Sequence, residues 1–128
     1  MIIRIILLPL IILLTACRTT QAPDGILTGH VSIGPLQPAV QVGMPEPTPN
    51  AEVYAARQIV IFDERGRKEI ARAPISDKGT YEIALPAGTY TVDINHTGID
   101  FAKGLPALVE IKAYEITRLD VSIDTGIR

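Results

Sequence analysis

From residue 27 onward, apolar and polar residues alternate in short runs that are separated by turn-forming residues. The clearest run is 89–95, in which Tyr90, Val92 and Ile94 alternate with polar side chains. Successive side chains of a strand point to opposite faces, so this pattern indicates a strand with one face in a core. No stretch has the apolar spacing of a helix of ten residues. The chain is therefore predicted to be all-β.

Seven runs of this kind follow one another, and most are separated by short turns. The expected strands are 27–33, 58–63, 69–75, 81–85, 89–95, 109–111 and 119–123. Seven short strands in about 100 residues are typical of two packed sheets. We therefore expect a seven-stranded antiparallel β-sandwich over 27–124 and a C-terminal tail over 125–128. A closed barrel is the less natural alternative for an odd number of strands.

Two segments interrupt this rhythm. The insert 34–52 contains five of the ten prolines in the chain, namely Pro35, Pro38, Pro45, Pro47 and Pro49. Proline has no backbone N–H, so this insert favours extended polyproline geometry and cannot form a central strand. The second segment is a long crossing over 96–106.

A stiff proline-rich segment loses little entropy on binding. If the chain has a binding surface, we predict that it combines these five prolines with the polar loop of Asn95, His96, Asp100 and Phe101. The alternative is that the prolines only keep a long crossover from pairing wrongly.

The N-terminus has the features of a secretory signal. Arg4 precedes an apolar run over 5–14, and the small residues Thr15 and Ala16 come directly before Cys17, the only cysteine. A positive start, a short apolar core and small residues before a cleavage site are typical of such signals. The stretch 5–17 is about 20 Å long as a helix, at roughly 1.5 Å per residue, which is too short to span a bilayer stably.

The tetrapeptide Leu14-Thr15-Ala16-Cys17 resembles the lipobox of bacterial lipoproteins. The resemblance implies cleavage after Ala16, so that 1–16 is the signal peptide, and a lipid anchor on Cys17, which ties the chain to a membrane. We then expect 17–26 to be a lipidated tether. Arg18 stands where some bacteria read aspartate as an inner-membrane signal, which favours the outer membrane, facing the periplasm of the cell envelope. An ordinary signal peptide with an incidental cysteine is the alternative.

The stretch SDKGTYEIALPAGTYTVDI at 76–94 resembles the signature of carboxypeptidase-regulatory-like domains, which share the prealbumin (transthyretin-like) sandwich. The matching residues are Gly79, Tyr81, Leu85, Pro86, Gly88 and Tyr90. The resemblance implies a hairpin in which Gly88 supplies an unusual backbone angle and the tyrosines Tyr81 and Tyr90 pair across the strands. It implies little about function, because such domains serve as accessory modules in many proteins.

One enzymatic reading comes from the same fold. The start of the domain, LTGHVSIGPLQPA at 27–39, superficially resembles hydroxyisourate hydrolases, in which a histidine of the first strand is catalytic, and His30 is the matching residue. That family also needs further histidine and arginine ligands and a C-terminal Tyr-Arg-Gly-Ser motif. This chain has only His96 besides His30 and ends differently. We therefore expect no catalytic residues, with His30 as a solvent-facing strand residue.

Other functions have weaker signals. Asp93, Asn95 and Asp100 can offer oxygen atoms to calcium, but their spacing matches no known loop. Two histidines and a lipidated cysteine are too few for zinc, so no metal or cofactor is expected.

Sugar binding would rely on the aromatic residues outside the expected core, namely Tyr54, Phe62, Phe101 and Tyr114. With 12 Lys and Arg against 14 Asp and Glu, a nucleic-acid partner is not expected. An envelope protein is the expected partner.

Overall fold

The alternating runs form nine strands, two more than the sequence predicted. A computed structural model describes residues 21–39 and 41–128, and the expected signal peptide and Cys17 lie outside these residues. The elements are β1 (Asp24–Gly34), α1 (Ala51–Ala55), β2 (Gln58–Phe62), β3 (Glu69–Pro74), β4 (Thr80–Pro86), β5 (Gly88–Ile94), β6 (Phe101–Ala102), β7 (Ala107–Ile111), β8 (Ile116–Arg118) and β9 (Val121–Asp124).

The two additional strands have clear local causes. β6 is a two-residue strand within the expected crossing, where it pairs with β9. β8 lies just before the last predicted run, and that run forms β9 only from Val121 onward. Between the two strands, the carboxylate of Asp120 accepts a hydrogen bond from the N–H of His30 at 2.8 Å. β1 itself begins at Asp24, three residues before the boundary expected between tether and domain.

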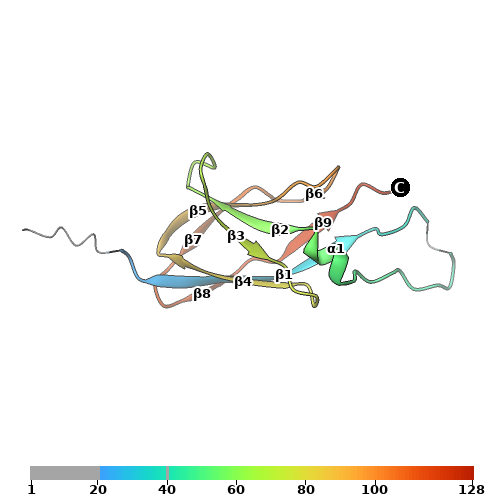
Figure 1. The fold of residues 1–128 in the computed structure, drawn as a ribbon, viewed down its shortest axis with the longest axis horizontal. Coiled ribbons are helices and arrows are strands. Elements are labelled where there is room, and N and C mark those ends of the chain that lie inside the picture. Colours follow the sequence, from blue (N-terminus) through green and yellow to red (C-terminus); the bar gives the residue numbers. More distant parts are fainter. Residues whose placement is uncertain (1–20, 40) are drawn as a thin grey trace, which may run out of the picture.

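The strands form two sheets that pack face to face (Figure 1). One sheet has the order β4-β1-β9-β6, with β8 also pairing with β1, and the other has the order β3-β2-β5-β7. The predicted β-sandwich is confirmed, and most strand pairs are antiparallel, but β1 pairs with β8 and with β9 in parallel. A parallel pair needs a crossover connection, and here the chain crosses through the second sheet before it returns beside β1.

The expected tyrosine hairpin does not form, because β4 and β5 belong to different sheets. The Tyr81 hydroxyl donates to the carbonyl of Leu119 at 2.5 Å, and the Tyr90 hydroxyl donates to the carbonyl of Pro86 at 2.6 Å. The second bond resembles a tyrosine corner, which fixes a connection between two sheets. Gly88 is also not among the residues with positive φ, so the unusual angle expected there is absent.

The core lies between the sheets and follows the predicted alternation. In β1 the buried side chains are Leu27, Val31 and Ile33, whereas His30 and Ser32 are exposed. Gly29 is buried in the same row because β1 and the β8–β9 connection approach closely: a Cβ at this position would lie 1.9 Å from the carbonyl oxygen of Leu119. The close approach therefore requires glycine.

The two ends of the sandwich differ. The chain enters β1 at one end, beside the β4–β5 connection, where the N–H of Ala87 donates to the carbonyl of Pro23 at 3.0 Å. The proline-rich segment, α1 and the C-terminus lie toward the opposite end (Figure 1). Within 21–39 and 41–128, none of the helical structure could cross a bilayer.

Candidate binding groove

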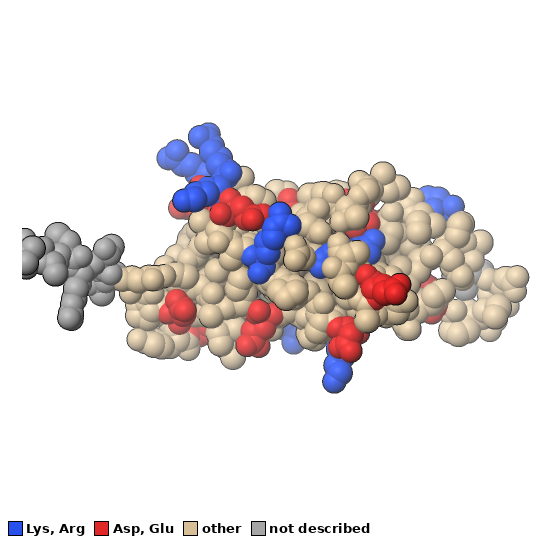
Figure 2. Space-filling view, viewed as in Figure 1, with Lys and Arg blue, Asp and Glu red and all other residues tan. Residues whose placement is uncertain are grey.

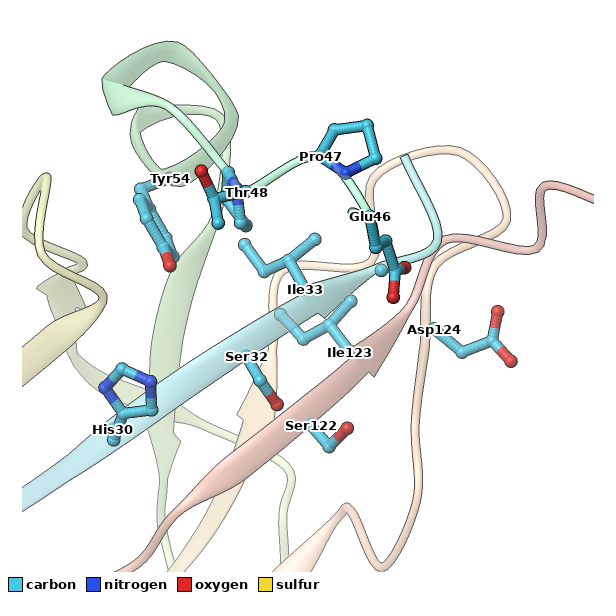
Figure 3. A pocket seen from close by; sticks show the side chains of 12 residues that line it. His30, Ser32, Ile33, Glu46, Pro47, Thr48, Tyr54, Ser122, Ile123 and Asp124 are labelled. Carbon is cyan, nitrogen blue, oxygen red and sulfur yellow. The ribbon is translucent and has the colours of Figure 1, made fainter. Parts of the chain in front are cut away.

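An open groove of about 590 Å³ lies where β1 and β9 approach the proline-rich segment (Figure 3). Its residues come from β1, β9, the segment 46–49 and α1. They are His30, Ser32, Ile33, Gly34, Glu46, Pro47, Thr48, Pro49, Tyr54, Ser122, Ile123 and Asp124. The groove thus combines hydroxyl and carboxylate groups with proline rings.

The groove exists because β1 extends beyond its partner strand. The pairing of β1 with β4 ends at His30, opposite Thr80, while β1 continues to Gly34. The segment 46–49 passes this end of β1, but Pro47 and Pro49 have no N–H to donate to a ladder. The segment therefore forms a wall of the groove and does not extend the sheet.

A short helix fixes the far end of this wall. The Asn50 side chain accepts a hydrogen bond from the N–H of Val53 at 3.0 Å, which caps α1. The single turn of α1 buries Tyr54, whose ring lines the groove. The proline-rich wall is thus tied to the core by α1.

Three carboxylates lie in or beside the groove. Arg128 and the N–H of Gly126 lower the pKa of Asp124, and the N–H of His30 and the side chain of Arg118 lower the pKa of Asp120. Both aspartates are therefore ionised at neutral pH. Glu46 forms no ion pair within the described part of the chain. Its carboxylate oxygens can accept hydrogen bonds.

Only some of the prolines predicted to form a binding surface line the groove. Pro47 and Pro49 line the groove, whereas Pro38 and Pro45 are exposed outside it. The carbonyl of Pro35 accepts a hydrogen bond from the hydroxyl of Thr125, so the expected C-terminal tail is bound to the start of the insert. The prolines therefore contribute to the groove only in part.

The polar loop of the prediction is hydrogen-bonded to the residues that follow α1. The carboxylate of Asp100 is buried and accepts hydrogen bonds from Arg57 at 2.7 and 3.1 Å. The Asn95 side chain accepts from the N–H of Gln58 at 3.1 Å and donates to the carbonyl of Ala56 at 3.2 Å. These two residues hold the junction between α1 and β2.

The other two residues of the predicted loop are exposed. His96 has φ +31, and its ring lies 3.1 Å from the carboxylate of Asp93, which raises the pKa of His96. Phe101 is exposed on β6. Asn95 and Asp100 are engaged by the fold, so His96 and Phe101 are the members of this loop that face solvent.

His30 lies in the groove and is exposed, as expected. Its backbone contacts Asp120, but no hydrogen bond involves its ring within 21–39 and 41–128. A catalytic base needs a nucleophile and an orienting group within hydrogen-bond reach. The second histidine, His96, pairs with Asp93 of the other sheet. The groove therefore does not reproduce the constellation of the hydrolase reading.

The residues weighed for metal and sugar binding are also dispersed. Within the described residues, no three His, Cys, Asp or Glu side chains form a group that could hold a metal ion. Of the aromatic residues considered for sugar binding, Tyr54 is buried and Phe62 is half-buried, while Phe101 and Tyr114 are exposed. Within the described part of the chain, the fold therefore does not bring together the residues considered for either kind of binding.

Sequence reasoning missed the groove residues Ser32, Glu46, Thr48, Ser122 and Asp124. They come from distant parts of the chain, and β1 and β9 bring Ser32 and Ser122 into register. The alternation alone indicates only that both serines face outward. It does not show that they are neighbours, because that depends on the parallel pairing of the first and last strands.

Comparisons with known proteins support the fold. A scan of family models and a search of curated proteins find no match. Among solved structures, similarity is found to GBS52, the minor pilin of Streptococcus agalactiae, with TM-score 0.55, 14% identity and coverage of 81% of this chain and 45% of that chain. The Bacillus anthracis TIE protein gives TM-score 0.52 and 20% identity, with coverage of 80% and 17%.

A DUF3823 family protein from Parabacteroides merdae has TM-score 0.49 and 17% identity, with coverage of 80% of this chain and 46% of that chain. This chain thus spans less than half the length of these three structures. At such identities the similarity concerns the fold alone, and the fold is an all-β sandwich.

Proposed function

We propose that this chain is a lipid-anchored protein of the bacterial cell envelope that acts as a non-catalytic binding or structural module. The observation that carries the proposal is the placement of the two ends. The chain enters the sandwich at one end, and the proline-rich segment lies toward the other (Figure 1). Pro47 and Pro49 of this segment line the groove. A lipid on Cys17 would hold the first end at the membrane, with the groove directed away from it.

A binding role fits the chemistry of the groove better than catalysis does. The groove presents the hydroxyls of Ser32, Ser122 and Thr48 and the carboxylate of Glu46. These groups accept hydrogen bonds, but none is activated by a neighbouring base. An envelope protein that offers a basic or hydroxyl side chain to Glu46 is the partner that these residues suit.

The anchor is tested by expression of the full chain in bacteria with labelled palmitate. The unsubstituted chain is expected to take up the label and to sediment with membranes. Cys17→Ser is expected to lose both properties, because the serine cannot form the thioether. Uptake of label by the Cys17→Ser chain, or none by the unsubstituted chain, would contradict the anchor.

The groove is tested separately, with a photo-crosslinking residue at Thr48 in intact cells. The substitution Ser122→Arg places a long cation in the groove, whereas Glu110→Arg places the same side chain on exposed β7 of the other sheet. Ser122→Arg is expected to abolish a defined crosslinked product that Glu110→Arg leaves intact. A product that survives both substitutions would show that the groove is not the contact.

A further inference from the structure

Two large apolar side chains project into solvent at the end where the chain enters the sandwich. Tyr114 is 87% exposed and Ile116 is 70% exposed. The N–H of Tyr114 donates to the carbonyl of Asp24 at 2.9 Å, and Ile116 lies opposite Ile26 in the parallel ladder. Both residues are therefore fixed beside the first residues of β1.

The backbone at Tyr114 is held in an uncommon conformation. Its φ of +62° lies in the left-handed region, and the turn is closed by a hydrogen bond of 3.2 Å from the N–H of Glu115 to the carbonyl of Lys112. For a residue other than glycine this conformation costs about 1–2 kcal/mol. Strained residues of this kind cluster at sites of recognition, and here the strain presents an aromatic ring to solvent.

The length of the segment that precedes β1 indicates what faces these side chains. Seven residues lead from Cys17 to Asp24, and at about 3.3–3.6 Å per residue they reach at most roughly 25 Å. Tyrosine is favoured at the membrane–water interface, where its ring is buried and its hydroxyl stays hydrated. Charged side chains of both signs also lie toward this end (Figure 2). Asp24, Lys112 and Glu115 are exposed beside the two apolar residues.

We propose that Tyr114 and Ile116 form a membrane-contacting tip that rests in the interface of the bilayer to which the chain is anchored. The inference rests on the proposed anchor, since without it nothing brings this end to a membrane. The contact orients the sandwich, so that the groove at the far end faces away from the lipid.

The sequence provides clean reporters for this contact. The chain has no tryptophan, so Tyr114→Trp introduces a single fluorophore. Cys17 is the only cysteine, and every strand among the described residues lies within 24–124, so a chain that begins at Cys17 keeps the sandwich and can be coupled through its thiol to maleimide lipid. The vesicles are phosphatidylcholine, with or without bromine on the acyl chains.

Tyr114→Trp is expected to show a blue-shifted emission and about a twofold loss of intensity in brominated vesicles, because an interfacial ring reaches the upper acyl chains. Ile116→Trp is expected to respond in the same way and serves if the first variant misfolds. The matched control is Met44→Trp, an exposed position outside this tip, which should not be quenched. The proposal would be overturned if each of the three variants emitted equally in vesicles with and without bromine.

The coupling is chemical and does not depend on lipidation in the cell. Absence of quenching therefore refutes the membrane-contacting tip and leaves the anchor untouched. Absence of palmitate on the cellular protein refutes the anchor.

Discussion

The ion pair between Arg57 and Asp100 can be used to test how α1, which contributes Tyr54 to the groove, is held against the sandwich. The side chain of Asp100 is 4% exposed and that of Arg57 is 14% exposed. The guanidinium also donates to the carbonyl of Val53, within α1, at 2.9 Å. We therefore predict that Asp100→Ala leaves a largely desolvated cation beside α1 and lowers the free energy of unfolding by about 3 kcal/mol.

The magnitude follows from two opposing contributions. Removal of one partner of a buried pair costs about 3–5 kcal/mol, and the partial exposure of Arg57 lets water recover some of that loss. Asp100→Asn keeps an acceptor for Arg57 and should lose about half as much, because a neutral hydrogen bond is roughly half as strong as a charge-assisted one. The double substitution Arg57→Met and Asp100→Leu should lie within about 1 kcal/mol of the unsubstituted chain, because no buried charge is left unpaired.

The assay is urea denaturation followed by circular dichroism. Glu69→Ala is the matched control, because Glu69 pairs with Arg72 at the same distance of 2.7 Å but with both side chains exposed. An exposed pair contributes at most about 1 kcal/mol. If Asp100→Ala and Glu69→Ala have equal effects, the reasoning from burial is refuted.

Three further predictions concern the sandwich. Tyr90→Phe removes the bond to Pro86 and should cost about 0.5–1.5 kcal/mol in urea denaturation, whereas Tyr114→Phe should cost nothing; equal losses would contradict the tyrosine-corner role. Gly29→Ala should prevent folding, as judged by circular dichroism, because its Cβ would meet the carbonyl of Leu119. Gly88→Ala should be tolerated, because a Cβ there would come no closer than 3.7 Å to the hydroxyl of Tyr90 and φ is not positive. The reverse result for the two variants would refute the packing described. Burial, with a smaller contribution from Asp120, raises the pKa of Tyr81 to about 12. The unfolded phenol ionises near pH 10 while the folded one stays neutral, so the contribution of Tyr81 to stability should be constant below pH 10 and fall by about 2–3 kcal/mol between pH 10 and 12. Tyr81→Phe should flatten that fall in alkaline denaturation, and an unchanged slope would contradict the assignment.

The sequence pattern predicted the local structure well where one face of a strand is buried. The alternation in β1 and β5 correctly separates buried Val31 and Val92 from their outward-facing neighbours. Two of the short turns expected between the runs form at 63–66 and 76–79: the N–H of Gly66 donates to the carbonyl of Asp63, and that of Gly79 donates to the carbonyl of Ser76, each at 2.9 Å. These features depend on neighbouring residues only.

Pairing between distant segments was not readable from the pattern. The stretch from Tyr81 to Tyr90 has the alternation of a hairpin, but Pro86 and Gly88 carry the chain between sheets. A hairpin and a corner place the same residues on the core side, and only the partner strands distinguish them. The end of the chain showed the same limit, because between β8 and β9 the carboxylate of Asp120 accepts a hydrogen bond from the N–H of distant His30.

The residues of the groove were predicted only in part, because the sequence does not show which distant strands pair. Pro47 and Pro49 mark the wall because proline excludes pairing wherever the segment lies. The floor residues Ser32 and Ser122 become neighbours only through the parallel pairing of β1 and β9. Asp100 was selected for its polarity, yet that polarity serves Arg57 inside the fold.

We propose that the sulfur of Cys17 bears the membrane anchor of a β-sandwich. Mass spectrometry of the N-terminal peptide, from protein extracted from bacterial membranes, tests this proposal. The peptide is expected to begin at residue 17 and to carry a diacylglyceryl group on its cysteine. An unmodified thiol at that position, or a peptide still joined to 1–16, would contradict it.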